Sequence, residues 1–249
     1  MMAYVFQYIR SVIFVILMYA WMLVLGIIGA IPAALSRDWA YKFMRFYCVS
    51  VFWLARVLCG LTYEIRGKVP TGSVIVASKH QSFLDVMVNF YTVERGNFVM
   101  KKELKWAPIL GFYAMRIGVA PVKRGARSKS MKEMVSGVEK EADTPSQLII
   151  YPQGTRVPPG KYLPYKVGAA VLCQRFDRPC IPVATNVGVF WNKRGLYRKP
   201  GVAVFEYFEP LQKGLSVEEM TTEMERVIET NSNRLMAEAG FDVPPQDAS

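Results

Sequence analysis

The chain has 249 residues, of which 52% are apolar, and its formal net charge at pH 7 is +11. This size fits one large α/β domain, alone or joined to a membrane segment, and the basic excess suggests an anionic partner: nucleic acid, a phospholipid surface or a phosphorylated substrate. The one histidine and the four cysteines, which form no C-x-x-C pair, offer no set of zinc ligands. We expect no metal and no cofactor, and we expect the cysteines to be buried in a reducing compartment.

The N-terminal region is a long uncharged stretch, with no Asp, Glu, Lys or Arg from Ser11 to Ser36. A helix of this length can cross a hydrocarbon core of roughly 30 Å at ~1.5 Å per residue. The stretch is too long for the apolar part of a signal peptide, and residues 30–33 are not a clean cleavage site. We therefore predict a membrane-associated helical segment over residues 1–60. The alternative is a buried helix of a soluble protein.

A second apolar stretch, Phe43 to Leu61, is interrupted by Arg45 and Arg56. This pattern is typical of a helix that lies in the membrane interface or returns to the side from which the chain entered. Basic residues flank the first stretch on both sides, so the positive-inside rule does not decide the topology. A single span and a re-entrant helical pair with both ends in the cytoplasm remain open.

His80, the one histidine of the chain, directly follows two predicted strands at residues 62–66 and 73–78. An unperturbed imidazole titrates near pH ~6.5, so it can accept a proton at neutral pH and return it. A histidine with a purely structural hydrogen bond is the alternative.

A predicted helix start follows His80. Ser82 and Asp85 have the spacing of a capping box, with Ser82 as N-cap and Asp85 at the third helical position. Within one helix, residues five positions apart would not share a face, but His80 lies before the cap, where the backbone can fold back. We therefore expect the Asp85 carboxylate to reach the imidazole, fix its tautomer and stabilise its cation. The alternative is that Asp85 only caps the helix.

A basic stretch begins after a short predicted strand at residues 98–100. Its charges are interleaved with apolar residues, so it is not a disordered arm, and on a folded surface near His80 they would suit a phosphate. No nucleic-acid recognition motif accompanies them, which disfavours a nucleic-acid partner. The basic residues are Lys101, Lys102, Lys105, Arg116, Lys123, Arg124, Arg127, Lys129 and Lys132.

A further predicted strand, residues 147–151, runs into a turn at residues 152–156, where α/β folds often place function. The segment from Gly154 to Tyr162 superficially resembles a phosphate-binding P-loop, but its spacing is one residue too long and Tyr162 replaces the required Ser or Thr. A Gly-x-Ser-x-Gly elbow is also lacking. The remaining predictions are helices over 127–142, 166–176 and 216–239, the last with a Ser216–Glu219 capping box, strands over 180–184 and 202–208, and a disordered tail over 243–249.

Four segments, in this order, resemble the signature blocks of the glycerolipid acyltransferases. The resemblance covers roughly residues 60 to 210, and the chain is most similar to the bacterial 1-acyl-sn-glycerol-3-phosphate acyltransferase family. The segments are His80 to Asp85, the H-x4-D signature; residues 101–104 with Pro108, Gly111, Gly118 and Arg124; residues 151–156, Tyr-Pro-Gln-Gly-Thr-Arg, where the family usually has Phe-Pro-Glu-Gly-Thr-Arg; and residues 181–183, Ile-Pro-Val.

This resemblance implies an α/β acyltransferase domain over residues 61–242, with a mixed sheet flanked by helices (the glycerolipid acyltransferase fold), behind an N-terminal membrane-embedded helical segment. It implies acyl transfer from acyl-ACP or acyl-CoA to the sn-2 hydroxyl of lysophosphatidic acid, which gives phosphatidic acid in phospholipid biosynthesis. His80 would act as general base and Asp85 would orient it. The alternatives are an acyltransferase for another lysolipid acceptor, such as lyso-ornithine lipid, and a non-catalytic membrane lipid-binding protein.

The resemblance also implies a setting and a set of substrate-binding residues. The expected setting is the cytoplasmic face of the inner membrane, in contact with the phospholipid bilayer. Gln153 departs from the family pattern, because it replaces the usual glutamate and leaves no carboxylate at that position, although its amide can donate and accept hydrogen bonds. The implied substrate-binding residues are Lys101, Arg124, Gln153, Gly154, Thr155 and Arg156, with Lys101, Arg124 and Arg156 on the acceptor's phosphate.

Overall fold

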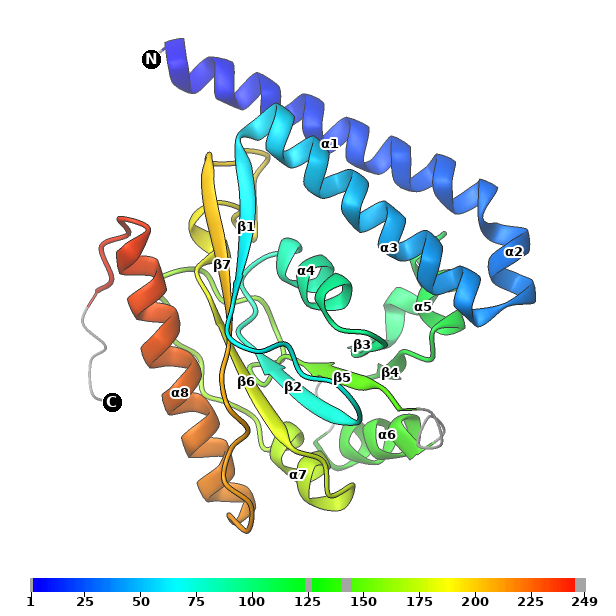
Figure 1. The fold of residues 1–249 in the computed structure, drawn as a ribbon, viewed down its shortest axis with the longest axis vertical. Coiled ribbons are helices and arrows are strands. Elements are labelled where there is room, and N and C mark those ends of the chain that lie inside the picture. Colours follow the sequence, from blue (N-terminus) through cyan, green and yellow to red (C-terminus); the bar gives the residue numbers. More distant parts are fainter. Residues whose placement is uncertain (1, 124–126, 140–144, 245–249) are drawn as a thin grey trace.

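The computed structural model describes residues 2–123, 127–139 and 145–244. The predicted tail lies outside these residues from position 245 onward, and so does the predicted end of the helix that begins at Arg127. The described chain forms one seven-stranded sheet with helices on both faces, and a long helical hairpin lies along one side (Figure 1).

The sheet has the strand order β1-β7-β6-β2-β5-β3-β4. Neighbouring strands are parallel except for β6 and β7, so the predicted mixed α/β sheet is confirmed. Parallel strands end at the same edge, so the carboxyl ends of β6, β2, β5, β3 and β4 lie along one side of the sheet. The strands are β1 (Leu61–Arg66), β2 (Val74–Ser78), β3 (Gly96–Lys101), β4 (Ala120–Val122), β5 (Gln147–Ile150), β6 (Cys180–Thr185) and β7 (Gly201–Tyr207).

The helices include each one that the sequence predicts, and α8 begins with the predicted capping box. The Ser216 hydroxyl accepts a hydrogen bond from the Glu219 N–H at 3.2 Å, and the Glu219 carboxylate accepts one from the Ser216 N–H at 2.8 Å. The helices are α1 (Met2–Ile28), α2 (Ala30–Leu35), α3 (Arg37–Leu54), η1 (Ala55–Cys59), α4 (Leu84–Thr92), η2 (Lys102–Trp106), α5 (Leu110–Arg116), α6 (Arg127–Glu139), α7 (Gly168–Arg175), η3 (Val187–Val189) and α8 (Val217–Glu238).

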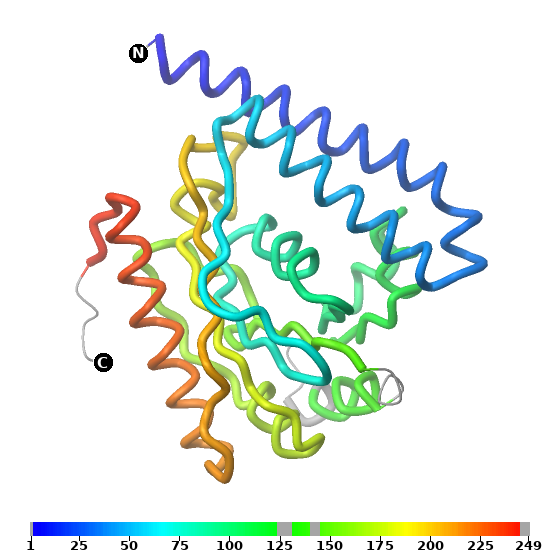
Figure 2. The backbone as a smooth tube through the Cα atoms, in the orientation of Figure 1, coloured from blue at the N-terminus to red at the C-terminus, as the bar shows by residue number. Residues whose placement is uncertain are grey.

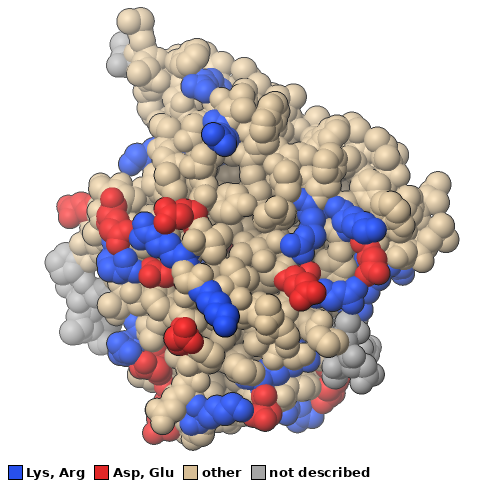
Figure 3. Space-filling view, in the orientation of Figure 1, with Lys and Arg blue, Asp and Glu red and all other residues tan. Residues whose placement is uncertain are grey.

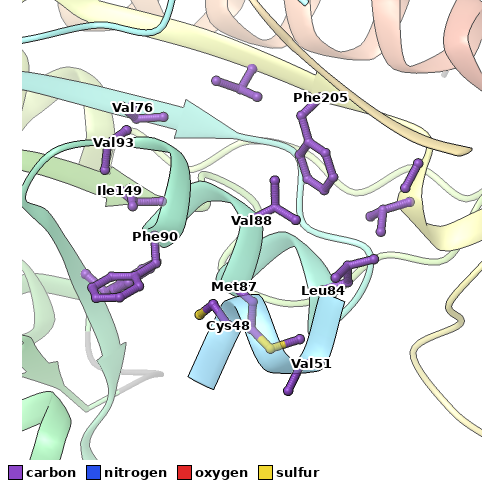
Figure 4. Packing of buried hydrophobic residues seen from close by; sticks show 14 of the residues in the cluster. Cys48, Val51, Val76, Leu84, Met87, Val88, Phe90, Val93, Ile149 and Phe205 are labelled. Carbon is purple, nitrogen blue, oxygen red and sulfur yellow. The ribbon is translucent and has the colours of Figure 1, made fainter. Parts of the chain in front are cut away.

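Both faces of the sheet carry an apolar core, because successive residues of a strand point to opposite sides. In β2, Val76 belongs to the core under α3 and α4, whereas Ile75 and Ala77 belong to the core under α6, α7 and α8. Figure 4 shows α4 between its two neighbours, with Met87 directed toward α3 and Val88 toward the sheet. Burial on both faces explains why the central strands are unbroken apolar runs.

The α1–α3 hairpin lies along one side of the protein, with α3 on its inner side and the start of α1 extending past the sheet (Figure 2). Near the start of α1, the Tyr4 ring stacks on Tyr197 with centroids 5.0 Å apart. Near its end, the Tyr113 hydroxyl donates to the Gly26 carbonyl at 3.2 Å, and a Cβ at Gly29 would lie 2.4 Å from the Tyr113 oxygen. The glycines therefore allow α5 to lie close against the hairpin.

The outer side of the hairpin is apolar. Among the described helices, α1 alone is long and apolar enough to cross a membrane. Large apolar side chains such as Phe6, Ile16 and Ile27 are exposed along it, and Figure 3 shows few charged residues over this part of the surface. All four cysteines are free and buried, as predicted.

Candidate active site

The carboxyl edge of the sheet brings together the segments that the sequence singled out. Lys79 and His80 follow β2, residues 151–156 follow β5, and Lys101 ends β3. These three strands are adjacent and parallel in the order β2-β5-β3. Since the spacing between neighbouring strands is about 4.8 Å, Lys101 lies roughly 10 Å across the sheet edge from the β2 line.

His80 and Asp85 form the predicted pair. The His80 Nδ1 atom lies 2.8 Å from the Asp85 Oδ1 atom, and the second carboxylate oxygen accepts hydrogen bonds from the backbone N–H groups of Gln81 and Ser82 at 2.8 and 2.7 Å. Asp85 is fully buried, whereas the His80 side chain is 13% exposed. The carboxylate is thus fixed by the backbone and holds an imidazole that solvent and substrate can reach.

The local backbone explains how residues five positions apart meet. The Lys79 N–H donates to the Val183 carbonyl of β6, and the His80 carbonyl accepts from the Val157 N–H, so His80 is still anchored to the sheet edge. The helix begins later than predicted: α4 starts at Leu84 with Phe83 as N-cap, and Ser82 is not the N-cap. The Ser82 hydroxyl instead accepts from the Leu84 N–H at 3.2 Å, and the loop that turns the chain back toward His80 is one residue longer than predicted.

Tyr151 contacts His80 directly. Their ring centroids are 4.0 Å apart and the ring planes differ by 22°. The Tyr151 hydroxyl is buried close to Asn89 and Asp85, but its contacts with them do not reach good hydrogen-bond geometry. Burial, and then the nearby Asp85 charge, raise its pKa well above the ordinary tyrosine value. Tyr151 is therefore protonated and offers a flat apolar face to the imidazole. The sequence shows that Tyr151 stands where the family usually has Phe, but it did not predict this contact with His80.

The turn after β5 is tight and cationic. Gly154 has a φ of +70°, which favours glycine, and its N–H donates to the Tyr151 carbonyl. The Lys166 ammonium lies 2.8 Å from the position of a Cβ on Gly154. The Arg156 carbonyl accepts from the Lys193 ammonium at 2.7 Å. Lys166 and Lys193 were not predicted as site residues, because each is distant from the turn in the sequence.

Gln153 points into the protein. It is 1% exposed, and its amide nitrogen donates to the Leu163 carbonyl at 3.1 Å and to the Glu229 carboxylate at 3.3 Å. A carboxylate therefore does lie near position 153, but it is supplied by α8. Sequence reasoning missed this residue, since Glu229 is one of many charged residues of an amphipathic helix.

The remaining predicted residues are placed less centrally. Lys101 is exposed and lies 3.7 Å from Glu103. Arg124 lies outside the described residues. Within the described part of the chain, no group of three or more His, Cys, Asp or Glu side chains could hold a metal ion.

An apolar cavity of about 100 Å³ adjoins the site. It lies between the N-terminal hairpin and the catalytic domain, and Phe83, two residues before Asp85, lines one side of it. The other lining residues come from α1, α3, α4, β3 and the α5 region: Met22, Leu25, Gly26, Phe43, Met44, Tyr47, Cys48, Val86, Met87, Phe90, Phe98, Ile109, Leu110 and Tyr113.

A histidine held by a buried carboxylate at the carboxyl edge of an α/β sheet is the arrangement of an enzyme. The chain belongs to the acyltransferase family, whose family model, described as "Acyltransferase", matches residues 60–186. The resemblance inferred from the four segments is thereby confirmed.

Similar proteins carry a consistent name. The 1-acyl-sn-glycerol-3-phosphate acyltransferase of Pseudomonas aeruginosa is 29% identical over 199 residues, which cover 78% of this chain and 77% of that protein. The enzyme of the same name from Limnanthes alba is 27% identical over 83% of this chain and 76% of its own length. The crystal structure of the 1-acyl-sn-glycerophosphate acyltransferase PlsC from Thermotoga maritima matches with a TM-score of 0.76 at 20% identity, over 94% of this chain and 99% of that one, and so shows the same fold.

Proposed function

We propose that this enzyme transfers a fatty acyl group from a thioester donor, acyl-ACP or acyl-CoA, to the sn-2 hydroxyl of 1-acyl-sn-glycerol-3-phosphate, giving phosphatidic acid. The names of its relatives support the reaction. The observation that carries the chemistry is the 2.8 Å contact between His80 and Asp85, with Asp85 itself fixed by two backbone N–H groups.

His80 is the general base. A proton on Nδ1, donated to Asp85, leaves the lone pair on Nε2, which makes no hydrogen bond within the described part of the chain. Nε2 takes the proton of the acceptor hydroxyl as its oxygen attacks the thioester carbonyl. The tetrahedral intermediate then expels the thiolate, which takes the proton back from the imidazolium. Asp85 stabilises the imidazolium between these steps. Because the acceptor hydroxyl attacks the thioester directly, no covalent acyl-enzyme forms.

The turn of residues 152–156 binds the phosphate of the acceptor. Arg156 provides a guanidinium, the residue type suited to bidentate phosphate binding, and the Lys166 ammonium lies beside Gly154 in the same turn. Backbone amides of Gly154 and Thr155 complete this part of the site. Lys101, and Arg124 as the resemblance assigns it, supply further positive charge from the neighbouring strands.

The apolar cavity of about 100 Å³ beside Phe83 receives part of an acyl chain. It lies between the N-terminal hairpin and α4, and Phe83 places it next to the loop that carries His80 and Asp85. Apolar lining is what a hydrocarbon chain requires, because transfer from water stabilises it by ~0.8 kcal/mol per buried CH₂ group.

Residues 1–60 hold the acyltransferase domain, residues 61–242, on the bilayer as a hairpin that stays on one side. The contacts of α1 with the domain at both of its ends favour this arrangement over a single span. If α1 crossed the membrane, Gln7 with its two partners, the carbonyls of Cys59 and Arg198, would lie on the opposite side from the Gly26–Tyr113 contact, although one folded domain supplies the partners at both ends. The domain faces the cytoplasm at the inner membrane, where its thioester donors are made.

One assay tests the proposal. Purified enzyme is given labelled acyl-ACP or acyl-CoA and a panel of lysolipids: lysophosphatidic acid, lysophosphatidylethanolamine and lyso-ornithine lipid. We expect phosphatidic acid as the main product. Equal or faster transfer to an acceptor without a phosphate monoester would overturn the choice of substrate, and no transfer to any acceptor would overturn catalysis.

A further inference from the structure

Glu229 lies at the centre of a buried polar cluster behind the active site. Its Oε1 atom accepts hydrogen bonds from the Lys79 ammonium at 2.5 Å, the Tyr165 hydroxyl at 2.9 Å and the Gln153 amide at 3.3 Å. Its Oε2 atom accepts a second one from Lys79 at 2.6 Å. Three segments distant in sequence therefore meet on one carboxylate of α8.

The cluster contains one buried ion pair. Lys79 is 2% exposed and Glu229 is 6% exposed. Burial lowers the pKa of Lys79, and the Glu229 charge works against that shift. Tyr165 stays protonated because burial, and then the Glu229 charge, raise its pKa well above the ordinary value. Removing one partner of a buried ion pair leaves the other charge uncompensated, so the two residues depend on each other.

The cluster holds both segments that form the site. Lys79 immediately precedes the base His80, and its side chain ties that position to α8. Gln153 lies between Tyr151, which stacks on His80, and Arg156, which ends the turn. A displacement of the cluster would therefore move the base and the phosphate-binding turn relative to each other.

We infer that Glu229 and Lys79 are positioning residues for acyl transfer: the Glu229 carboxylate fixes His80 through Lys79 and the 152–156 turn through Gln153. Gln153 is an amide because it must donate to a carboxylate that α8 already supplies. The roles assigned to His80 and Arg156 rest on the proposed function. The hydrogen bonds of Glu229 with Lys79 and Gln153 do not depend on it.

This arrangement predicts how a negative charge at position 153 changes the stability of the protein. In a Gln153→Glu variant two carboxylates face one ammonium, with Tyr165 as the other facing titratable group and Glu225 one turn away on α8. Like charges at this distance raise the pKa of one carboxyl group in the folded protein above its unfolded value. Stability is then lowest above that raised pKa and recovers as the pH falls and the carboxyl group is protonated.

The test is a double-mutant cycle of Gln153→Glu and Glu229→Gln in the full-length enzyme, with Tm, kcat and KM for lysophosphatidic acid measured for each form. We expect each single variant to lower kcat by about 10- to 100-fold, because small displacements of the base are costly. The double variant, which moves the carboxylate from α8 to the turn, should regain much of the loss. The surface variant Glu223→Gln, which changes the same charge on the same helix, is the matched control and should leave kcat and KM unchanged.

Two results would overturn the inference. The first is independence, in which the fold-changes in kcat of the single variants simply multiply in the double variant. The second is a loss of Tm with no change in kcat or KM, which would make the cluster purely structural. If Glu229→Gln does not fold, Gln153→Glu alone decides: its Tm deficit against wild type should shrink as the pH falls from about 8 to about 5, and a constant deficit contradicts the pairing. Failure of acyl transfer in the wild type would be seen separately, and Tm would still test the cluster.

Discussion

Tyr151 lies face to face with His80, with ring centroids 4.0 Å apart. The aromatic ring limits the tilt of the imidazole, while the Tyr151 hydroxyl makes no hydrogen bond of good geometry within the described part of the chain. The ring and the hydroxyl can therefore be separated experimentally. We expect the ring to serve the reaction and the hydroxyl to be dispensable.

Tyr151→Phe keeps the ring and removes an unsatisfied polar atom. We expect kcat within about threefold of wild type and a free energy of unfolding no lower than that of wild type, measured by urea denaturation. Tyr151→Ala should lower kcat by about tenfold or more, because the imidazole loses its restraint. If both variants lost activity equally, the hydroxyl would have to take part in the reaction.

Asp85→Asn tests orientation of the base. The asparagine oxygen can still accept from the Gln81 or Ser82 N–H, so we expect the fold to persist, while kcat falls by about 100-fold or more because the imidazolium loses its counter-charge. Ser82→Ala is the matched control in the same loop, since it removes only the bond to the Leu84 N–H and should cost about 1 kcal/mol of stability with kcat retained. A loss of activity by Asp85→Asn that merely follows its loss of stability would support capping alone.

Arg156→Ala tests the phosphate site. We expect KM for lysophosphatidic acid to rise by about 10- to 100-fold, because a charge-assisted hydrogen bond is lost, with a smaller change in kcat. Lys161→Ala, an exposed cation of the same loop, is the matched control and should leave KM unchanged. An Arg156→Ala enzyme with the wild-type KM would exclude this role.

The topology of the hairpin can be tested by measuring how deep spin labels on α1 lie in a bilayer. Spin labels at Phe6→Cys, Ile16→Cys and Ile27→Cys, all exposed positions along α1, should lie at similar shallow depths in anionic vesicles if the helix lies along the membrane. A spanning helix would place the middle label deepest and the two end labels in opposite leaflets. The four native cysteines are buried, which favours labelling at the introduced sites.

The sequence predicted the parts of the molecule whose signals are local. Unbroken apolar runs located the central strands, the Ser216–Glu219 spacing located the start of α8, and the His80–Asp85 spacing located the pair. The predicted start of α4 was wrong by one residue, because capping at Ser82 competes with a loop that Asp85 itself stabilises by accepting two backbone N–H groups.

The contacts that depend on tertiary structure could not be predicted. Glu229 is one of many charged residues on an amphipathic helix, and only the packing of α8 on the sheet brings it to Lys79 and Gln153. The approach of Lys166 to Gly154 likewise depends on how the loop before α7 folds back. Side chains that meet across long sequence separations leave no periodic signal, so such residues become visible only in three dimensions.

The most direct test of the central claim is single-turnover acyl transfer to lysophosphatidic acid by His80→Ala and by wild type. Tm is measured for both proteins to show that the variant is folded. Because general-base catalysis contributes about 10²- to 10⁴-fold, we predict a rate loss in that range, with added imidazole restoring part of the activity. A His80→Ala enzyme that transfers the acyl group within a few-fold of the wild-type rate would contradict the assignment of His80 as the base.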